Sequence, residues 1–211
     1  MSLLPKIGIE IPCSCLALNT PMTIGTSLFT LDFKGGIKVR VEINPNEPLN
    51  SVRLRVVGHK ISAELPADDS STESPQPRSA TVQPRSATGT PRPTTITIEQ
   101  QDVDLDLKSV LRLTSKFPPR FEQLMVLSFT MTIENPEAVL RKAGIQMTVP
   151  SEPLVLSTKN PVQLVSKLTK FPPKGDMYKL MNPMELVLPD NPDTTIVKID
   201  SFPISVGESK S

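Results

Sequence analysis

The sequence holds few groups that could act together in catalysis. His59 is the only histidine, so a serine or cysteine hydrolase would have to use it as its general base. No nucleophile-elbow motif accompanies it, and its neighbours Gly58 and Lys60 indicate the surface of a strand. The nine glycines are scattered, so a phosphate-binding glycine loop is missing as well. We therefore expect no catalytic residue and a protein that is not an enzyme.

Cys13 and Cys15 are the only two thiols. Residues two apart in a strand point to the same face, and the loop between them is too short for an easy disulfide. A zinc site needs about four ligands, which these thiols and one histidine do not supply. We expect buried or half-buried free thiols, no metal and no cofactor. Free thiols also favour a reducing compartment, so we expect a cytoplasmic protein.

Three carboxylates alternate with apolar residues at Asp102, Asp104 and Asp106. They could face one side of a strand, as raw material for a divalent-cation site. Calcium loops, however, place their ligands on a curved turn with glycine at the bend, and this segment is extended. The favoured interpretation is a solvated strand face, or a charged edge that prevents strand addition.

Four basic residues, Lys38, Arg40, Arg53 and Arg55, would project from one face if their two strands pair. Such a face suits the phosphates of nucleic acid or of an anionic membrane, and it is our candidate polyanion site. Two acidic residues share the face, and aromatic side chains for stacking on bases are missing from it. An ordinary mixed-charge sheet surface is the favoured alternative.

A basic residue followed by Phe-Pro-Pro and a second basic residue occurs twice, over 116–120 and 170–174. Exposed, these segments could dock into an aromatic-lined groove of a partner protein. As strand corners, they would tuck the phenylalanine inward while the prolines end a strand, and this structural interpretation is favoured. The candidate docking residues are Phe117, Pro118, Pro119, Phe171, Pro172 and Pro173.

The elements that would position these groups are short strands. Apolar and polar residues alternate over 27–43, which predicts two strands joined by a three-residue loop at 34–36. That register pairs Phe33 with Ile37 across the hairpin. A third strand follows from Val52 toward Leu65, so residues 1–65 form an antiparallel meander.

Composition divides the rest of the chain. Residues 66–93 are almost purely polar, Pro, Ala and Gly, and cannot bury enough surface to become ordered, so we expect a disordered Pro/Ser/Thr-rich insert. It joins two alternating strands as a long hairpin loop would. Residues 94–211 form a second β region with an internal repeat, which the two Phe-Pro-Pro strings suggest. We expect this region to share one domain with 1–65.

The second region contains one short helix among strands. Asn135 can cap it, Pro136 suits its first turn, and Gly144 can end it. The sequence therefore predicts an all-β fold, an antiparallel sandwich or barrel of about eight to twelve short strands with one short helix and a long disordered loop. The predicted strands after the insert are 96–107, 123–133, 145–149, 161–168, 184–188 and 194–206.

Charge and hydropathy limit the classes of function. Lysine and arginine total 23 against 22 acidic residues, so the overall field steers neither nucleic acid nor membrane. Apolar runs fall far short of the ~20 residues that span a bilayer, and 1–12 does not look like a leader peptide. We expect no transmembrane segment. In general build the chain resembles small viral matrix, movement or coat-associated proteins, a likeness that carries no residue-level match.

Our leading hypothesis is therefore a structural or interaction protein. It would self-associate, or bind a protein partner, through exposed sheet edges or methionine-rich surface. Contact with nucleic acid or an anionic membrane would use the basic face. The alternative is a closed β-barrel that binds an apolar small molecule and has no free edges.

Overall fold

The computed structural model describes residues 3–65, 93–101, 109–145 and 153–208. Within these ranges the chain forms thirteen antiparallel strands and one short helix, which confirms the predicted all-β class. No helix in the described part is long and apolar enough to cross a membrane. The elements are β1 (Glu10–Ile24), β2 (Ser27–Ile43), β3 (Ser51–Leu65), β4 (Thr94–Gln100), β5 (Val110–Lys116), β6 (Pro119–Leu127), β7 (Phe129–Ile133), α1 (Pro136–Lys142), β8 (Leu154–Thr158), β9 (Val162–Leu168), β10 (Lys174–Leu180), β11 (Met184–Leu188), β12 (Asn191–Ile199) and β13 (Ile204–Glu208).

The sheet closes on itself. Its strand order runs from β12 through β11, β8, β7, β4, β3, β2, β1, β13, β10, β9 and β6 to β5, and two further pairings join β12 to β1 and β5 to β3. Every strand in the described part of the chain therefore has a hydrogen-bonded neighbour on each side. Closure removes the free edges on which the self-association hypothesis depended, so that part of the hypothesis is wrong.

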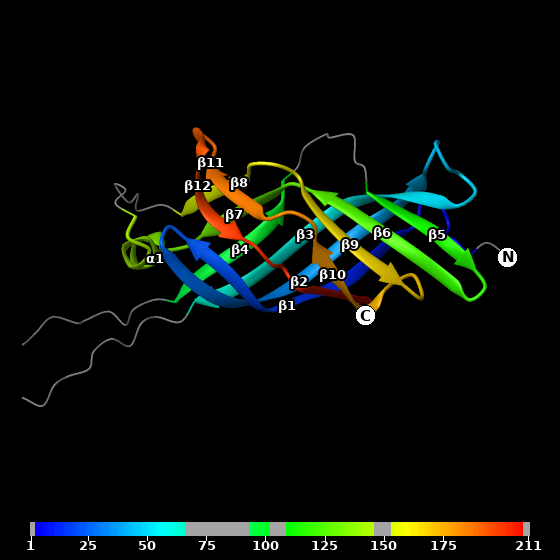
Figure 1. The fold of residues 1–211 in the computed structure, drawn as a ribbon, viewed down its shortest axis with the longest axis horizontal. Helices are drawn as coiled ribbons and strands as arrows, with labels where there is room; N and C mark the ends of the chain where they lie inside the picture. The colour runs from blue at the N-terminus through cyan, green and yellow to red at the C-terminus, as the bar shows by residue number, and fades with distance from the viewer. Residues whose placement is uncertain (1–2, 66–92, 102–108, 146–152, 209–211) are drawn as a thin grey trace, which may run out of the picture.

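The circumference of the barrel holds eight runs of chain. Three of them, β1, β2 and β3, are unbroken strands of 15 to 17 residues that extend along the length of the molecule (Figure 1). Each of the other five consists of two successive strands, namely β4 and β5, β6 and β7, β8 and β9, β10 and β11, and β12 and β13. The first and last of these pairs show the pattern, because β4 and β5 both pair with β3, while β12 and β13 both pair with β1. The result is an up-and-down barrel in which each run pairs with the next one along the chain.

The long β2 corrects the predicted hairpin at 34–36. The odd-numbered side chains from Phe29 to Val41 are buried without a change of phase on either side of Gly35, so Phe33 and Ile37 lie on one strand. A Cβ atom added to Gly35 would lie 2.0 Å from the Lys60 carbonyl oxygen of β3. Glycine at this position therefore serves the close approach of two strands and not a turn.

Inward residues of all eight runs form one apolar core. Two aromatic contacts lie in this core, each next to the point where one of the two-strand runs passes from its first strand to its second. Phe202, between β12 and β13, meets Phe33 edge to face with ring centroids 6.3 Å apart. Phe129, directly after the break between β6 and β7, lies 5.0 Å from the His59 ring. We call these four rings the waist of the barrel.

The predicted helix is confirmed as α1, with Pro136 in its first turn and Gly144 just beyond its end at φ 69°. Asn135 is the capping residue, but its side chain donates and accepts no capping hydrogen bond. Val139 and Leu140 are buried. The Thr26 hydroxyl donates to the Ala143 carbonyl, so α1 is fastened to the β1–β2 turn at the end of the barrel opposite the N-terminus (Figure 1).

Strands from both predicted regions lie in the same sheet. Leu65 at the end of β3 pairs with Thr94 at the start of β4, so the two ends of the insert meet in one hairpin. The disorder predicted for 66–93 and the strand predicted at 145–149 fall outside the described residues, apart from the end residues 93 and 145. The runs predicted at 123–133 and 194–206 are each split in two, by Ser128 and by 200–203.

Candidate functional site

His59 is the most unusual residue of the interior. It lies on β3 opposite Ile37, is 5% exposed, and packs against Phe129. Among the described residues neither Nδ1 nor Nε2 has a hydrogen-bond partner. Because nearly all buried polar side chains in folded proteins are hydrogen-bonded, an unpartnered imidazole in an apolar core marks a candidate binding site.

The sequence interpretation of His59 as a surface residue is wrong, and a β-bulge is the reason. Lys38 pairs with Gly58 while Val39 pairs with Val56, so Val57 is an extra residue in β3. Before the bulge, the odd-numbered residues from 53 onward in β3 face outward. The extra residue shifts this alternation by one position, so the side chain of His59 faces inward. The pair Val57-Gly58 interrupts the alternation, and it is the only signal in the sequence that could have indicated the bulge.

Burial determines the charge of the imidazole. It lowers the pKa of His59 to about 4, because the surrounding apolar side chains disfavour the charged form. The ring is therefore neutral near pH 7, where one nitrogen can donate a hydrogen bond and the other can accept one. A neutral imidazole suits a hydroxyl or carbonyl group of a largely apolar molecule.

The other polar groups of the interior are satisfied. The Tyr178 hydroxyl donates to Gln123 Oε1 at 2.6 Å, and both side chains are buried. The Ser166 hydroxyl donates to the Met177 carbonyl at 2.8 Å. Among the described polar side chains of the core, His59 alone therefore lacks a hydrogen-bond partner.

Cys13 and Cys15 are free and buried, as predicted. Burial raises the pKa of Cys13 to about 11 and that of Cys15 to about 12, so neither forms a thiolate at neutral pH. His59 has no hydrogen-bonded nucleophile or acid in the described part of the chain. No group of three or more potential metal ligands occurs there either.

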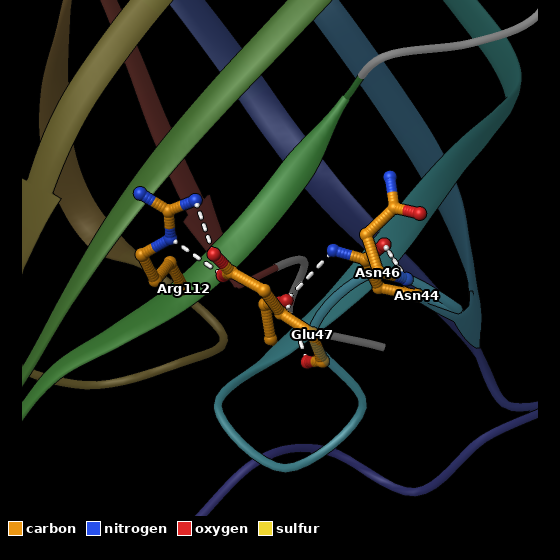
Figure 2. A network of polar contacts seen from close by, with 5 residues as sticks. Asn44, Asn46, Glu47 and Arg112 are labelled. Atoms are coloured by element: carbon orange, nitrogen blue, oxygen red, sulfur yellow. Dashed lines mark hydrogen bonds and ion pairs between the residues drawn. The ribbon is translucent and has the colours of Figure 1, made fainter.

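A polar network lies at the end of the barrel that carries the β2–β3 loop. The Arg112 guanidinium of β5 donates to both carboxylate oxygens of Glu47, at 3.0 and 3.1 Å (Figure 2). The Ser51 hydroxyl donates to the Glu47 carbonyl, and Asn44 Nδ2 donates to the Ser51 hydroxyl. An open hollow of about 350 Å³ adjoins this network, but its guanidinium and carboxylate already bind each other. We interpret the network as a clamp that holds the β2–β3 loop to β5.

The four residues of the candidate polyanion site share the outer face of β2 and β3, as predicted. Arg40 pairs directly with Arg55 across the two strands. Glu10 contacts both Lys38 and Arg40, and Glu42 lies 2.8 Å from Arg55. Acidic neighbours thus offset much of the basic charge on this face, and polyanion binding there remains a prediction.

Both Phe-Pro-Pro segments are loops at one end of the barrel, between β5 and β6 and between β9 and β10. The Phe117–Pro118 and Phe171–Pro172 peptide bonds are both cis. Phe171 packs partly against the core, whereas Phe117 is 95% exposed and does not tuck inward. The three aspartates at 102, 104 and 106 lie outside the described residues.

No protein-family model and no curated protein matches the chain. A solved structure with a similar fold was found. It is DynF from the dynemicin biosynthesis pathway of Micromonospora chersina, with a TM-score of 0.58, 12% identity, and coverage of all of this chain and 85% of that one. At this identity the likeness shows the fold alone.

These findings overturn the leading hypothesis from the sequence. The barrel is closed, and the solved structure that it resembles in fold, DynF, comes from a biosynthesis pathway. The interpretation as an assembly module of viral type is therefore wrong, whereas self-association through the methionine-rich surface stays a prediction. It relied on short strands with presumed free edges, and the sequence does not reveal that the first and last runs pair with each other.

Proposed function

We propose that this protein binds a small, largely apolar molecule inside its barrel, and that it does so without catalysing a reaction on it. The observation that carries the proposal is the unpartnered imidazole of His59 within an otherwise apolar and satisfied interior. Burying such a group without a partner costs about 1–3 kcal/mol, which a bound hydroxyl or carbonyl group would recover. The DynF fold supports the proposal, because DynF comes from a pathway that makes a small molecule.

The number of strand runs and the side chains of the core support this role. An eight-stranded barrel is just wide enough to be filled by side chains or to hold one small ligand. Four buried methionines, Met22, Met125, Met131 and Met184, belong to the core. Methionine side chains adapt their shape readily, so the core can rearrange around a guest.

The ligand would lie at the waist, where His59 contacts Phe129. We expect an apolar skeleton that packs between the rings and a single hydroxyl or carbonyl group that reaches the imidazole. The buried free thiols suit a reducing environment, so we further propose that binding takes place in the cytoplasm.

The test starts with the full chain purified under native conditions. Extraction with organic solvent and mass spectrometry should release an apolar compound, and returning it to stripped protein should restore binding. His59→Leu should weaken that binding by roughly tenfold, the value of one buried hydrogen bond, whereas His59→Gln should keep part of it.

Lys34→Ala changes an outward residue of the same barrel and serves as the control. Two results would refute the proposal: an empty extract combined with no uptake of apolar probes, or equal affinity in the wild type and in His59→Leu.

A further inference from the structure

The repeated Phe-Pro-Pro segments are brought together by the fold. β6 and β9 are neighbours in the sheet, with Phe121 paired to Leu168, and each strand adjoins one of the two loops. The loops at 117–118 and 169–173 therefore project side by side from one end of the barrel. A third loop, between β2 and β3, lies at the same end because Ser51 pairs with Arg112 of β5.

This end of the barrel exposes large apolar side chains on protruding loops. Phe117 is 95% exposed and Leu49, in the β2–β3 loop, is 87% exposed. Ile43, where β2 ends, is 61% exposed. A fully solvated phenylalanine at a loop tip contributes nothing to the core, so its role is to be sought outside the barrel.

Basic residues flank the two tips. Lys116 and Arg120 border the first loop, and Lys170 and Lys174 border the second. Neither 116–120 nor 170–174 contains an acidic residue. The Lys174 backbone N–H donates to Asp176 Oδ2, and Glu47, the acidic residue of the third loop, binds Arg112. Each of the two Phe-Pro-Pro tips is therefore an apolar segment flanked by two basic residues.

We infer that this end of the barrel docks on an anionic lipid bilayer. Phe117 would enter the boundary between headgroups and acyl chains, and the four flanking basic residues would contact lipid phosphates. A fluid bilayer suits separate, convex tips because lipids rearrange around each one. A protein partner would instead need a continuous complementary face of about 800 Å². The inference does not depend on ligand binding in the interior.

The chain contains no tryptophan, which provides a direct reporter of insertion. Phe117→Trp places a single indole at the tip, and Leu28→Trp places one at the opposite end of the barrel, where Leu28 is 68% exposed. On adding vesicles of phosphatidylcholine with phosphatidylglycerol, we expect emission from Phe117→Trp to shift to shorter wavelength and to be quenched by brominated lipid. Emission from Leu28→Trp should not change.

Vesicle sedimentation gives the affinities. Phe117→Ser should lower partitioning about fivefold through loss of apolar burial, and Leu28→Ser should leave it unchanged. Replacing Lys170 and Lys174 by glutamine should lower it roughly thirtyfold, at about 1 kcal/mol for each charge, whereas the same change at Lys34 and Lys159 should have little effect. Binding should also weaken as salt is raised.

Three outcomes would overturn the inference: no binding of the wild type to anionic vesicles in low salt, equal binding to neutral vesicles, or equal loss in the Phe117 and Leu28 variants. Failure to extract or bind an apolar ligand would leave it standing, so the two proposals fail separately.

Discussion

Replacing His59 by leucine should make the protein more stable, and more so as the pH falls. Near pH 7 the imidazole is neutral in the folded and the unfolded chain, so the substitution removes only an unpartnered buried polar group. Removing such a group and filling its space with a side chain of similar size should gain about 1 kcal/mol in the free energy of unfolding.

The effect of acid follows from the two pKa values. In the folded protein the pKa of His59 is lowered to about 4 from an ordinary value of 6.5. The unfolded state therefore binds a proton as the pH falls through 6.5, while the folded state remains neutral until near pH 4. The free energy of unfolding therefore falls as the pH falls from about 6.5 to about 4. Integration from pH 7 to about pH 4.5 gives a loss of about 2 kcal/mol from this one residue.

Urea denaturation at both pH values, followed by circular dichroism, measures the effect. Carboxylates also titrate in this range, but they do so in both proteins. Because His59 is the only histidine, the difference between the wild type and His59→Leu isolates it. The gap in unfolding free energy should widen from about 1 to about 3 kcal/mol. A gap that does not change with pH, or a variant less stable than the wild type at both values, would refute the buried, unpartnered state of this side chain.

Three further predictions concern the rest of the interior. Gly35→Ala should lower the unfolding free energy measured by urea denaturation by at least about 2 kcal/mol, because the alanine Cβ would lie 2.0 Å from a β3 carbonyl oxygen. A variant of wild-type stability would contradict this close approach of the two strands. Tyr178→Phe should lower it by about 1–2 kcal/mol by leaving Gln123 unpaired, and the double variant with Gln123→Leu should recover most of that loss; no recovery would mean that the hydrogen bond is not responsible. The thiols of Cys13 and Cys15 should react with a thiol-specific reagent in native protein far more slowly than in urea, since burial raises the pKa of both; equal rates would show that they are accessible.

Part of the fold could be predicted locally. The helix at α1 follows from Asn135, Pro136 and Gly144, whose preferences act within a few residues. The strand from Val52 to Leu65 and the hairpin that encloses the insert follow from alternation on either side of it. These features depend on contacts between residues close in sequence or on the pleat of a single strand.

The candidate site could not be predicted in the same way. The inward turn of His59 depends on one extra residue at Val57, and a bulge is decided by how β3 pairs with β2. Gly35 and Gly36 resemble a hairpin turn in sequence, but the neighbouring strands hold them within an extended β2. The same strand pairing determines which side chains reach the interior.

The sequence by itself determined the alternating strands, the short helix, the polar insert between two paired strands and the buried thiols, because each of these is a property of short range. Only the tertiary structure decided that the sheet closes. The pairing of β1 with β12 and β13 joins residues more than 170 positions apart, and no local preference encodes it. Closure in turn removed the free edges, enclosed His59 among apolar side chains, and brought the two Phe-Pro-Pro loops to one end of the barrel.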